Sequence, residues 1–162
     1  MKPHAPSALT APSAARRLRA LAALAPSLPA AFAVRNLLAT DPSASVRAGA
    51  LAWLARSPFG RVAAGRVVEA LDDADPGVRA AAARALGAHR DITAEDSLAA
   101  GALSDRVWWV RRACLLAAAK RDPAGAVSVL VKALDDPFWR VRHAALAVLE
   151  AMGAADAAVR TE

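Results

Sequence analysis

The sequence predicts an all-α fold, an α-solenoid of about four stacked helix pairs behind an N-terminal capping helix. The main observation is a Val-Arg pair that recurs at spacings of 32, 32 and 31 residues and opens an apolar helical stripe each time: Val46-Arg47, Val78-Arg79, Val110-Arg111 and Val141-Arg142. A fixed period of this size is typical of repeat proteins, in which each unit buries its apolar face against the next. The second observation is composition, because the chain is 56% apolar and alanine supplies most of that fraction. Alanine favours helices that pack closely.

The N-terminal segment is expected to hold a leader and the capping helix. Residues 1–12 are rich in Pro, Ala and Ser and show no apolar period, which predicts a flexible leader. A first helix is expected at 14–25, where leucines recur at helical spacing. The stretch from Arg16 to Ala33 also fits a secretory signal peptide, but Arg19 stands where the apolar centre of such a peptide should begin. We therefore favour the capping helix.

Four helix pairs follow, and Asp-Pro steps mark several expected helix starts. The predicted pairs are 29–39 with 43–56, 60–72 with 76–87, 94–103 with 107–120, and 124–135 with 138–152. An aspartate before a proline suits the N-cap and first turn of a helix, and such steps occur at Asp41-Pro42, Asp75-Pro76, Asp122-Pro123 and Asp136-Pro137. Thr93 and Asp96 are expected to form a capping-box start. Residues 13–152 form the predicted repeat domain, and 153–162 a tail or the start of a truncated further repeat.

The second helix of each pair repeats the same spacing of apolar residues. Its apolar positions follow an i, i+4, i+7, i+8 stripe, as in Val78, Ala82, Ala85 and Leu86. The i+4 position is always small, which allows close helix approach; it holds Ala50, Ala82, Cys114 and Ala145. Cys114 is therefore predicted to be a buried apolar residue rather than a nucleophile.

Charge and cysteine content limit the function classes. The net charge is +6, but residues 1–40 contain five basic residues and no acidic residue, so the rest of the chain is nearly neutral. This distribution does not predict strong phosphate tracking, although a basic arm remains possible. One cysteine cannot form an internal disulfide, so a reducing cytoplasm is expected. No metal-ligand spacing and no membrane-spanning segment are predicted.

The segment Asp75-Pro76-Gly77-Val78-Arg79, followed by Ala82, Ala85 and Leu86, resembles the HEAT repeat of the PBS-lyase-like subclass. The resemblance covers residues 28–152 and implies a right-handed α-solenoid. It also implies that the shared arginines and the turn aspartates bond between neighbouring repeats in an Asp/Arg ladder. The expected members of the ladder are Arg47, Arg79, Arg111, Arg142, Asp41, Asp75, Asp105 and Asp136.

The last two repeats depart from the pattern by placing aromatic residues immediately before their Val-Arg pairs. Trp108 and Trp139 occupy equivalent positions, as do Arg112 and His143. We therefore expect a binding patch near the helix N-termini, here called the Trp/Arg patch, made of Trp108, Trp109, Arg112, Trp139, Arg140 and His143. Tryptophan and arginine are enriched at binding hot spots, and indole faces receive bases or cations. The alternative is that these tryptophans only pack across the turns.

A shorter resemblance concerns catalysis. Residues 108–113 are similar to the Trp-x-Arg-Arg segment of bacterial HEAT-like alkylpurine DNA glycosylases, which pair concave-face tryptophans with a catalytic aspartate. Here the residue one turn after Trp109 is Ala113 and the residue after Trp108 is Arg112. No carboxylate matches the catalytic role, and His4, His89 and His143 lie in unlike contexts. No catalytic residue is predicted.

The sequence therefore favours a non-enzymatic cytoplasmic scaffold or adaptor that binds a protein or peptide on its concave, second-helix face. Nucleic-acid binding through the Trp/Arg patch is the first alternative, in the manner of damaged-DNA recognition. A lyase-like chaperone for a flat cofactor is the second, although no cofactor is predicted. Residues 153–162 offer no polar capping helix, so self-association through the C-terminal end is also possible.

Overall fold

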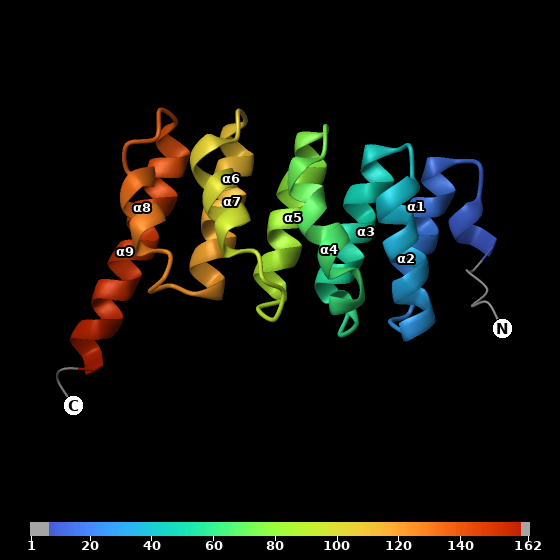
Figure 1. Ribbon diagram of the computed structural model, residues 1–162, viewed down its shortest axis with the longest axis horizontal. Helices are drawn as coiled ribbons and strands as arrows, with labels where there is room; N and C mark the ends of the chain where they lie inside the picture. The colour runs from blue at the N-terminus through green and yellow to red at the C-terminus, as the bar shows by residue number, and fades with distance from the viewer. Residues whose placement is uncertain (1–6, 160–162) are drawn as a thin grey trace. The chain divides into compact units, whose positions relative to one another are not determined.

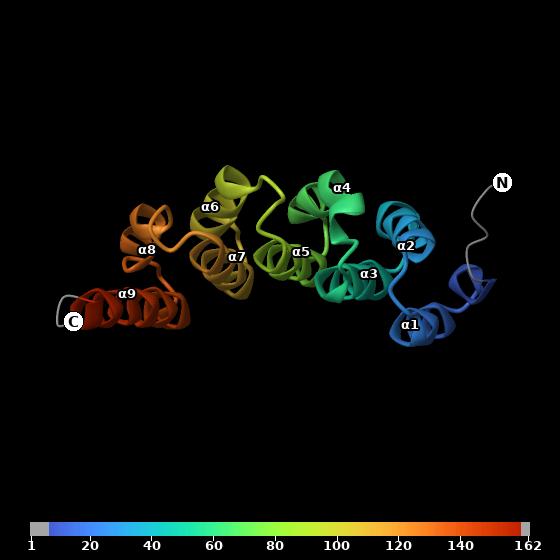
Figure 2. The same cartoon turned by 90° about the horizontal axis from the view of Figure 1, so that it is seen from below.

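The computed structural model describes residues 7–159, with backbone only for residue 7 and residues 154–159. Every regular element in this range is helical and none is a strand, which confirms the all-α prediction. The chain divides after Thr93 into two compact units. Each unit is a stack of helices in two layers, in which the first and second helices of the pairs lie on opposite sides (Figures 1 and 2).

The first unit contains the capping helix and two helix pairs. Its elements, shown from blue to green in Figure 1, are the 3-10 helix η1 (Ser7–Thr10), α1 (Ala14–Ala23), α2 (Leu28–Thr40), α3 (Ala44–Arg56), η2 (Gly60–Ala63), α4 (Ala64–Glu69), η3 (Ala70–Asp72) and α5 (Pro76–Ala88). Helices α1, α3 and α5 form one layer, and α2 and α4 form the other (Figure 2). Trp53 of α3 fixes the end of α1, because its indole Nε1 donates to the Leu24 carbonyl at 2.9 Å.

The second unit contains two further pairs. They are α6 (Glu95–Ser104) with α7 (Trp108–Arg121), and α8 (Val127–Ala133) with α9 (Trp139–Val159). Helices α7 and α9 lie side by side in one layer, and α6 and α8 in the other (Figure 2). The two helices that carry all six residues of the Trp/Arg patch are therefore neighbours within one unit.

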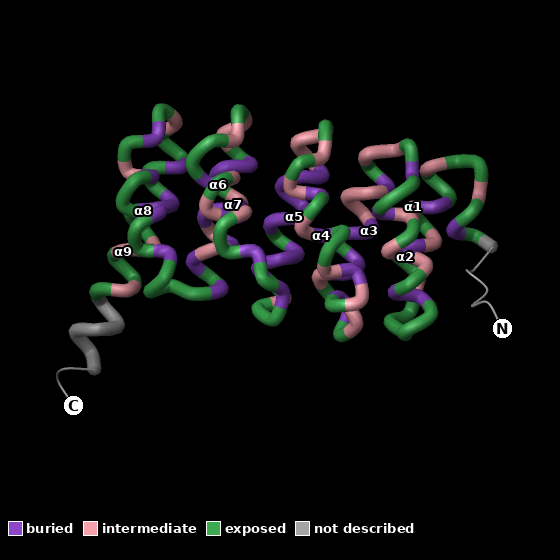
Figure 3. Tube along the Cα trace, viewed as in Figure 1, coloured by how far each residue is buried: buried purple, intermediate pink, exposed green. Residues whose placement is uncertain are grey.

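The core of each unit follows the stripe that the sequence predicts. The valines of the four Val-Arg pairs are all buried, as are the small residues one turn later: Val46, Val78, Val110, Val141, Ala50, Ala82, Cys114 and Ala145. Buried positions recur along each helix between exposed ones (Figure 3). The small residues allow close approach, since a Cβ added at Gly101 of α6 would lie only 2.7 Å from the Cys114 sulfur of α7.

Both termini differ from the sequence prediction. Residues 7–12 are not a leader without structure: Leu9 of η1 is only 1% exposed, and the carbonyls of Ala11 and Pro12 accept hydrogen bonds from Arg17. Residues 1–6 lie outside the described residues. At the other end, α9 does not stop at residue 152 but continues to Val159. The alanine-rich stretch after Gly153 contains no helix-breaking residue, which accounts for the continuation.

The Asp-Pro steps were expected to cap helices, but only one of them does so. Asp75 is the N-cap of α5 and accepts from the backbone N–H groups of Gly77 and Val78. Asp41 and Asp122 instead end α2 and α7. The expected capping box at Thr93 is also absent, because α6 begins at Glu95 and the Glu95 carboxylate accepts from the Ala94 N–H.

Candidate functional site

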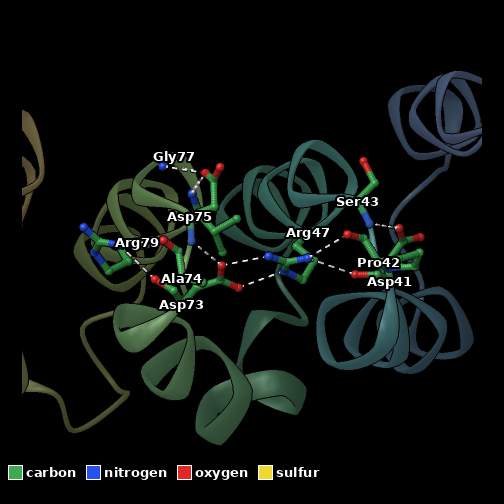
Figure 4. Close-up of polar contacts among 10 residues, drawn as sticks. Asp41, Pro42, Ser43, Arg47, Asp73, Ala74, Asp75, Gly77 and Arg79 are labelled. Atoms are coloured by element: carbon green, nitrogen blue, oxygen red, sulfur yellow. Dashed lines mark hydrogen bonds and ion pairs between the residues drawn. The ribbon is translucent and has the colours of Figure 1, made fainter.

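Within each unit, an arginine near the start of a second helix joins that helix to the next helix pair. In the first unit the Arg47 guanidinium donates from Nε and Nη2 to both oxygens of Asp73, each at 2.8 Å. Its Nη1 donates to the carbonyls of Asp41 and Pro42 in the turn before its own helix (Figure 4). One side chain thus holds its own turn and the turn of the next pair. Planar bidentate pairing of this kind is characteristic of arginine.

The same geometry recurs in the second unit. Arg111 donates to both oxygens of Asp136 at 2.6 and 2.8 Å, and to the Asp105 carbonyl at 2.8 Å. Arg79 and Arg142 make the matching bonds to the carbonyls of their own turns. In every case the first of these carbonyls lies six residues before the arginine.

These bonds change the acidity of the carboxyl groups. The hydrogen bond from Arg111 lowers the pKa of Asp136, and the bond from Arg47 lowers the pKa of Asp73, in each case against the opposing effect of burial. Burial is the largest influence on Asp41 and acts to raise its pKa, but the bonds from Arg17 and from the Ser43 N–H outweigh it and lower the pKa. All three carboxylates are therefore stabilised in the charged form.

Asp75 does not belong to this set, which corrects the sequence prediction. The aspartate that pairs with Arg47 is Asp73, and Asp75 caps α5. The sequence contains a signal that separates the two residues, namely the constant six-residue offset between the paired aspartate and the following arginine. Asp41, Asp73, Asp105 and Asp136 all keep this offset, whereas Asp75 does not.

Two further ion pairs were not predicted. Arg17 of α1 donates to both oxygens of Asp41 at 2.7 and 2.8 Å, so the capping helix takes part in the ladder. Its position, 30 residues before Arg47, is the sequence signal for this role. Arg121 of α7 donates to Glu95 at 2.6 Å, and this bond lowers the pKa of Glu95 to about 2. The other helix pairs have no residues that match Arg121 and Glu95, so no periodic signal in the sequence predicts this ion pair.

The structure brings five of the six residues of the Trp/Arg patch together. Trp108 and Arg112 of α7 and Trp139, Arg140 and His143 of α9 line an open pocket of about 540 Å³, here called the Trp/Arg pocket. They meet because α7 and α9 are adjacent and these residues occupy their first two turns. Trp109 does not line the pocket, and is 37% exposed elsewhere on α7.

Arg140 bridges the two indoles of the pocket. Its guanidinium carbon lies 5.2 Å from the Trp108 ring centroid and 5.1 Å from that of Trp139, within the range of cation–π interactions. Phe138 stacks on Trp108 with a centroid separation of 4.3 Å and an interplanar angle of 17°. His143 meets Trp139 edge-on at 6.5 Å. The Trp108 ring is thus held by Phe138 and Arg140, while Trp139 remains 55% exposed.

An apolar groove continues from this pocket between α7 and α9. Arg112 and His143 line both cavities, so the two form one surface. The groove has a volume of about 770 Å³ and is lined mainly by alanine, leucine, valine and methionine side chains, including Leu116, Ala147, Val148, Ala151 and Met152. Asp122, which follows the last residue of α7, also lines the groove. The surface therefore combines cationic and aromatic groups at one end with an apolar floor along its length.

The remaining groups with possible chemistry are accounted for by packing. Cys114 is buried between α6 and α7. His89 lies in the first unit, with Nε2 2.8 Å from the Leu54 carbonyl, far along the chain from His143. Among the described residues, no group of three or more His, Cys, Asp or Glu side chains is placed to hold a metal ion. No described helix has both the length and the apolar character needed to cross a membrane.

The comparison with known families agrees with this geometry. A family model described as HEAT repeats matches residues 33–119 and, in a second overlapping copy, residues 95–160. The two matches together span residues 33–160, from within α2 to the end of α9, which is most of the chain. No curated protein matches the sequence.

Proposed function

Because the chain belongs to the HEAT-repeat family, we propose that it is a non-enzymatic scaffold or adaptor that binds a protein or peptide partner on the surface of α7 and α9. The observation that carries this proposal is the joining of the Trp/Arg pocket to the apolar groove. Exposed indole, guanidinium and aliphatic groups in one concavity are the usual composition of a peptide-binding hot spot. The single buried cysteine suits a reducing cytoplasmic environment.

The charges of the surface define the chemistry of the partner. Arg112 and Arg140 contribute positive charge at the pocket, and no carboxylate lines it. The groove offers apolar contacts over two helices. The best match is an amphipathic peptide that places an acidic residue in the pocket and aliphatic side chains along the groove. Such helix-in-groove binding uses anchors at i, i+3, i+4 and i+7.

The same geometry ranks the peptide above nucleic acid. Base recognition by stacking needs a free aromatic face. Phe138 and Arg140 already contact the Trp108 ring, so within the pocket only Trp139 offers a widely exposed indole. No carboxylate in the pocket could act on a flipped base, which argues against glycosidic cleavage.

A peptide-display selection tests the proposal. Peptides enriched on the protein are measured for affinity to the wild type, to Arg112→Ala/Trp139→Ala, and to Arg84→Ala/Phe32→Ala. The last variant removes an exposed arginine and an exposed phenylalanine of the first unit as a matched control. We expect acidic, amphipathic peptides whose affinity falls at least tenfold in the first variant and is unchanged in the control. Equal affinity for all three proteins contradicts the proposal.

Titration with duplex and single-stranded DNA across a salt series tests the alternative, nucleic-acid binding. Binding that weakens steeply with salt and is abolished by Trp108→Ala/Trp139→Ala would establish nucleic acid as the ligand instead. A visible absorbance band in the purified protein would indicate the flat cofactor that the lyase-like alternative requires.

A further inference from the structure

A second surface of α9, distinct from the groove, is exposed along one stripe of the helix. Leu146 is 47% exposed, although the residues equivalent to it, Leu51 in α3 and Leu115 in α7, are both 0% exposed. Leu51 and Leu115 stand four residues after their ladder arginines, as Leu146 stands four after Arg142. In the preceding repeats this position is covered by the next helix pair, since α3 packs on α5 and α7 packs on α9. Leu146 therefore occupies a helix-packing position without a covering helix among the described residues.

Arg142 also lacks a contact that the equivalent arginines, Arg47 and Arg111, make with the next helix pair. The guanidinium is oriented by its Nη1 bonds to the carbonyls of Asp136 and Pro137, at 2.8 and 3.1 Å. The corresponding groups of Arg47 and Arg111 bind a carboxylate of the next pair. Among the described residues, no carboxylate forms an ion pair with Arg142, and the residue is exposed. Its Nε and Nη2 donors are thus positioned for an acidic group from another molecule.

The stripe around Leu146 is complementary to itself. On a helix of 3.6 residues per turn, positions four and seven residues away on either side share one face. Glu150 is exposed four residues after Leu146, and Arg142 is exposed four residues before it. Seven residues away, the exposed Trp139 on one side corresponds to the exposed Gly153 on the other. A two-fold axis at Leu146 therefore relates a cation to an anion and a large side chain to a glycine.

We propose that the chain forms a two-fold symmetric dimer in which two copies of α9 pack antiparallel about Leu146. Arg142 of each copy then pairs with Glu150 of the other, Leu146 packs on its symmetry mate, and Trp139 covers Gly153. This is an isologous contact, in which residue i meets residue j and j meets i, and it closes after two copies. The inference does not rest on the proposed function, because the groove is lined by Ala144, Ala147, Val148 and Ala151 on another side of α9. The two surfaces share Trp139, which also lines the Trp/Arg pocket, so the variants that test the dimer leave this residue unchanged.

A head-to-tail arrangement is disfavoured by charge. In that arrangement, the Arg142 donors of one copy would contact the N-terminal segment of another copy. The contact would fall six residues before Arg17, the offset at which the paired aspartates stand before their arginines. That position is Ala11, whose carbonyl already accepts from Arg17. Residues 1–40 contain no acidic residue and five basic ones. The partner that offers a carboxylate at the correct place is therefore a second α9.

Light scattering coupled to size exclusion tests the dimer with the full chain. A single helix face is smaller than the roughly 1,600 Å² of a standard interface, so the wild type is run from about 10 µM to about 1 mM. We expect a mass that rises with concentration from 16.7 kDa to twice that value. Leu146→Glu and Glu150→Arg should each raise the dissociation constant at least tenfold. Asp72→Arg, which makes a similar charge change at an exposed residue of the first unit, should leave it unchanged.

A mixing experiment tests the antiparallel register. Glu150→Arg and Arg142→Glu each place like charges opposite one another in a homodimer, so both should be monomeric alone. Mixed together they restore both ion pairs, and a heterodimer should form with near wild-type affinity. Circular dichroism of each variant checks that it is folded. A wild type that stays monomeric at the highest concentration, a dimer insensitive to Leu146→Glu, or a mixture that fails to associate would each overturn the proposal.

Discussion

Arg111 and Asp136 form a buried bidentate ion pair, with both bonds shorter than 3 Å and both side chains at most 10% exposed. A lysine at position 111 would keep the positive charge but lose the planar fork of donors. We expect Arg111→Lys to lower the free energy of unfolding by about 1.5–3 kcal/mol, because a lysine cannot replace the two parallel bonds and the carbonyl bond. Urea denaturation monitored by circular dichroism measures this. Arg142→Lys is the matched control, since Arg142 makes the carbonyl bonds but no ion pair. Equal losses in the two variants would show that the carbonyl bonds alone matter.

Acid should destabilise the fold through the same carboxylates. The pKa of Asp136 and of Asp73 is lowered, and the pKa of Glu95 falls to about 2. A group whose pKa is lower in the folded chain stabilises the fold above its unfolded pKa of about 4, and this contribution is lost as the pH falls through the folded value. We expect the urea midpoint to fall between about pH 5 and about pH 2. Asp136→Asn should start from a lower midpoint and lose less on acidification; a parallel decline would contradict this assignment.

The contact between Gly101 and Cys114 should tolerate no added carbon. A Cβ at Gly101 would lie 2.7 Å from the Cys114 sulfur, so Gly101→Ala is expected to destabilise the protein by about 1–3 kcal/mol through overpacking. Cys114→Ala removes the clashing atom, and the double variant should therefore lose less than the sum of the two single variants. Gly65→Ala is the control, because nothing lies within 4 Å of its added carbon. Additive losses in the double variant are the result that excludes the clash.

The two tryptophans Trp53 and Trp139 should differ sharply in their effect on stability. Trp53 is 3% exposed and donates to the Leu24 carbonyl, so Trp53→Ala is expected to cost about 3–5 kcal/mol. Trp139 is 55% exposed, and Trp139→Ala should cost no more than about 1 kcal/mol, the range of an exposed cation–π contact. Thermal unfolding at low protein concentration measures both. A large loss for Trp139→Ala would assign it a structural role instead of a binding role.

Much of the fold is predictable because the helical period and the Val-Arg repeat act together. The valine, the small residue one turn later and the leucine that follows are dictated by burial, and burial leaves a periodic trace in the sequence. Helix ends are less predictable. Asp41 and Asp75 both precede proline, yet only Asp75 caps a helix, because α5 begins at Pro76 whereas α3 begins at Ala44 with Ser43 as its N-cap. The Asp41 carboxylate instead pairs with Arg17, which lies 24 positions away in the sequence.

The candidate site is predictable in position but not in detail. Equivalent places in adjacent repeats bring Trp108 and Trp139 to one pocket, as the period implies. The insertion of Arg140 between the two indoles and the stacking of Phe138 on Trp108 depend on side-chain rotamers, which are fixed by packing and leave no periodic trace. Arg121 and Glu95 escape sequence reasoning for the same reason, since their pairing occurs in one repeat only.

Each ladder arginine is anchored by the carbonyls of its own turn before it reaches the neighbouring aspartate. Arg47 and Arg111 thus each hold their own turn and bind the aspartate of the following helix pair within the same unit. Removing or inserting one whole period of sequence keeps the six-residue offset between aspartate and arginine, whereas a change of a few residues between them breaks it. The architecture can therefore change its length by gene duplication or loss in steps of about one repeat, without inventing a new joint.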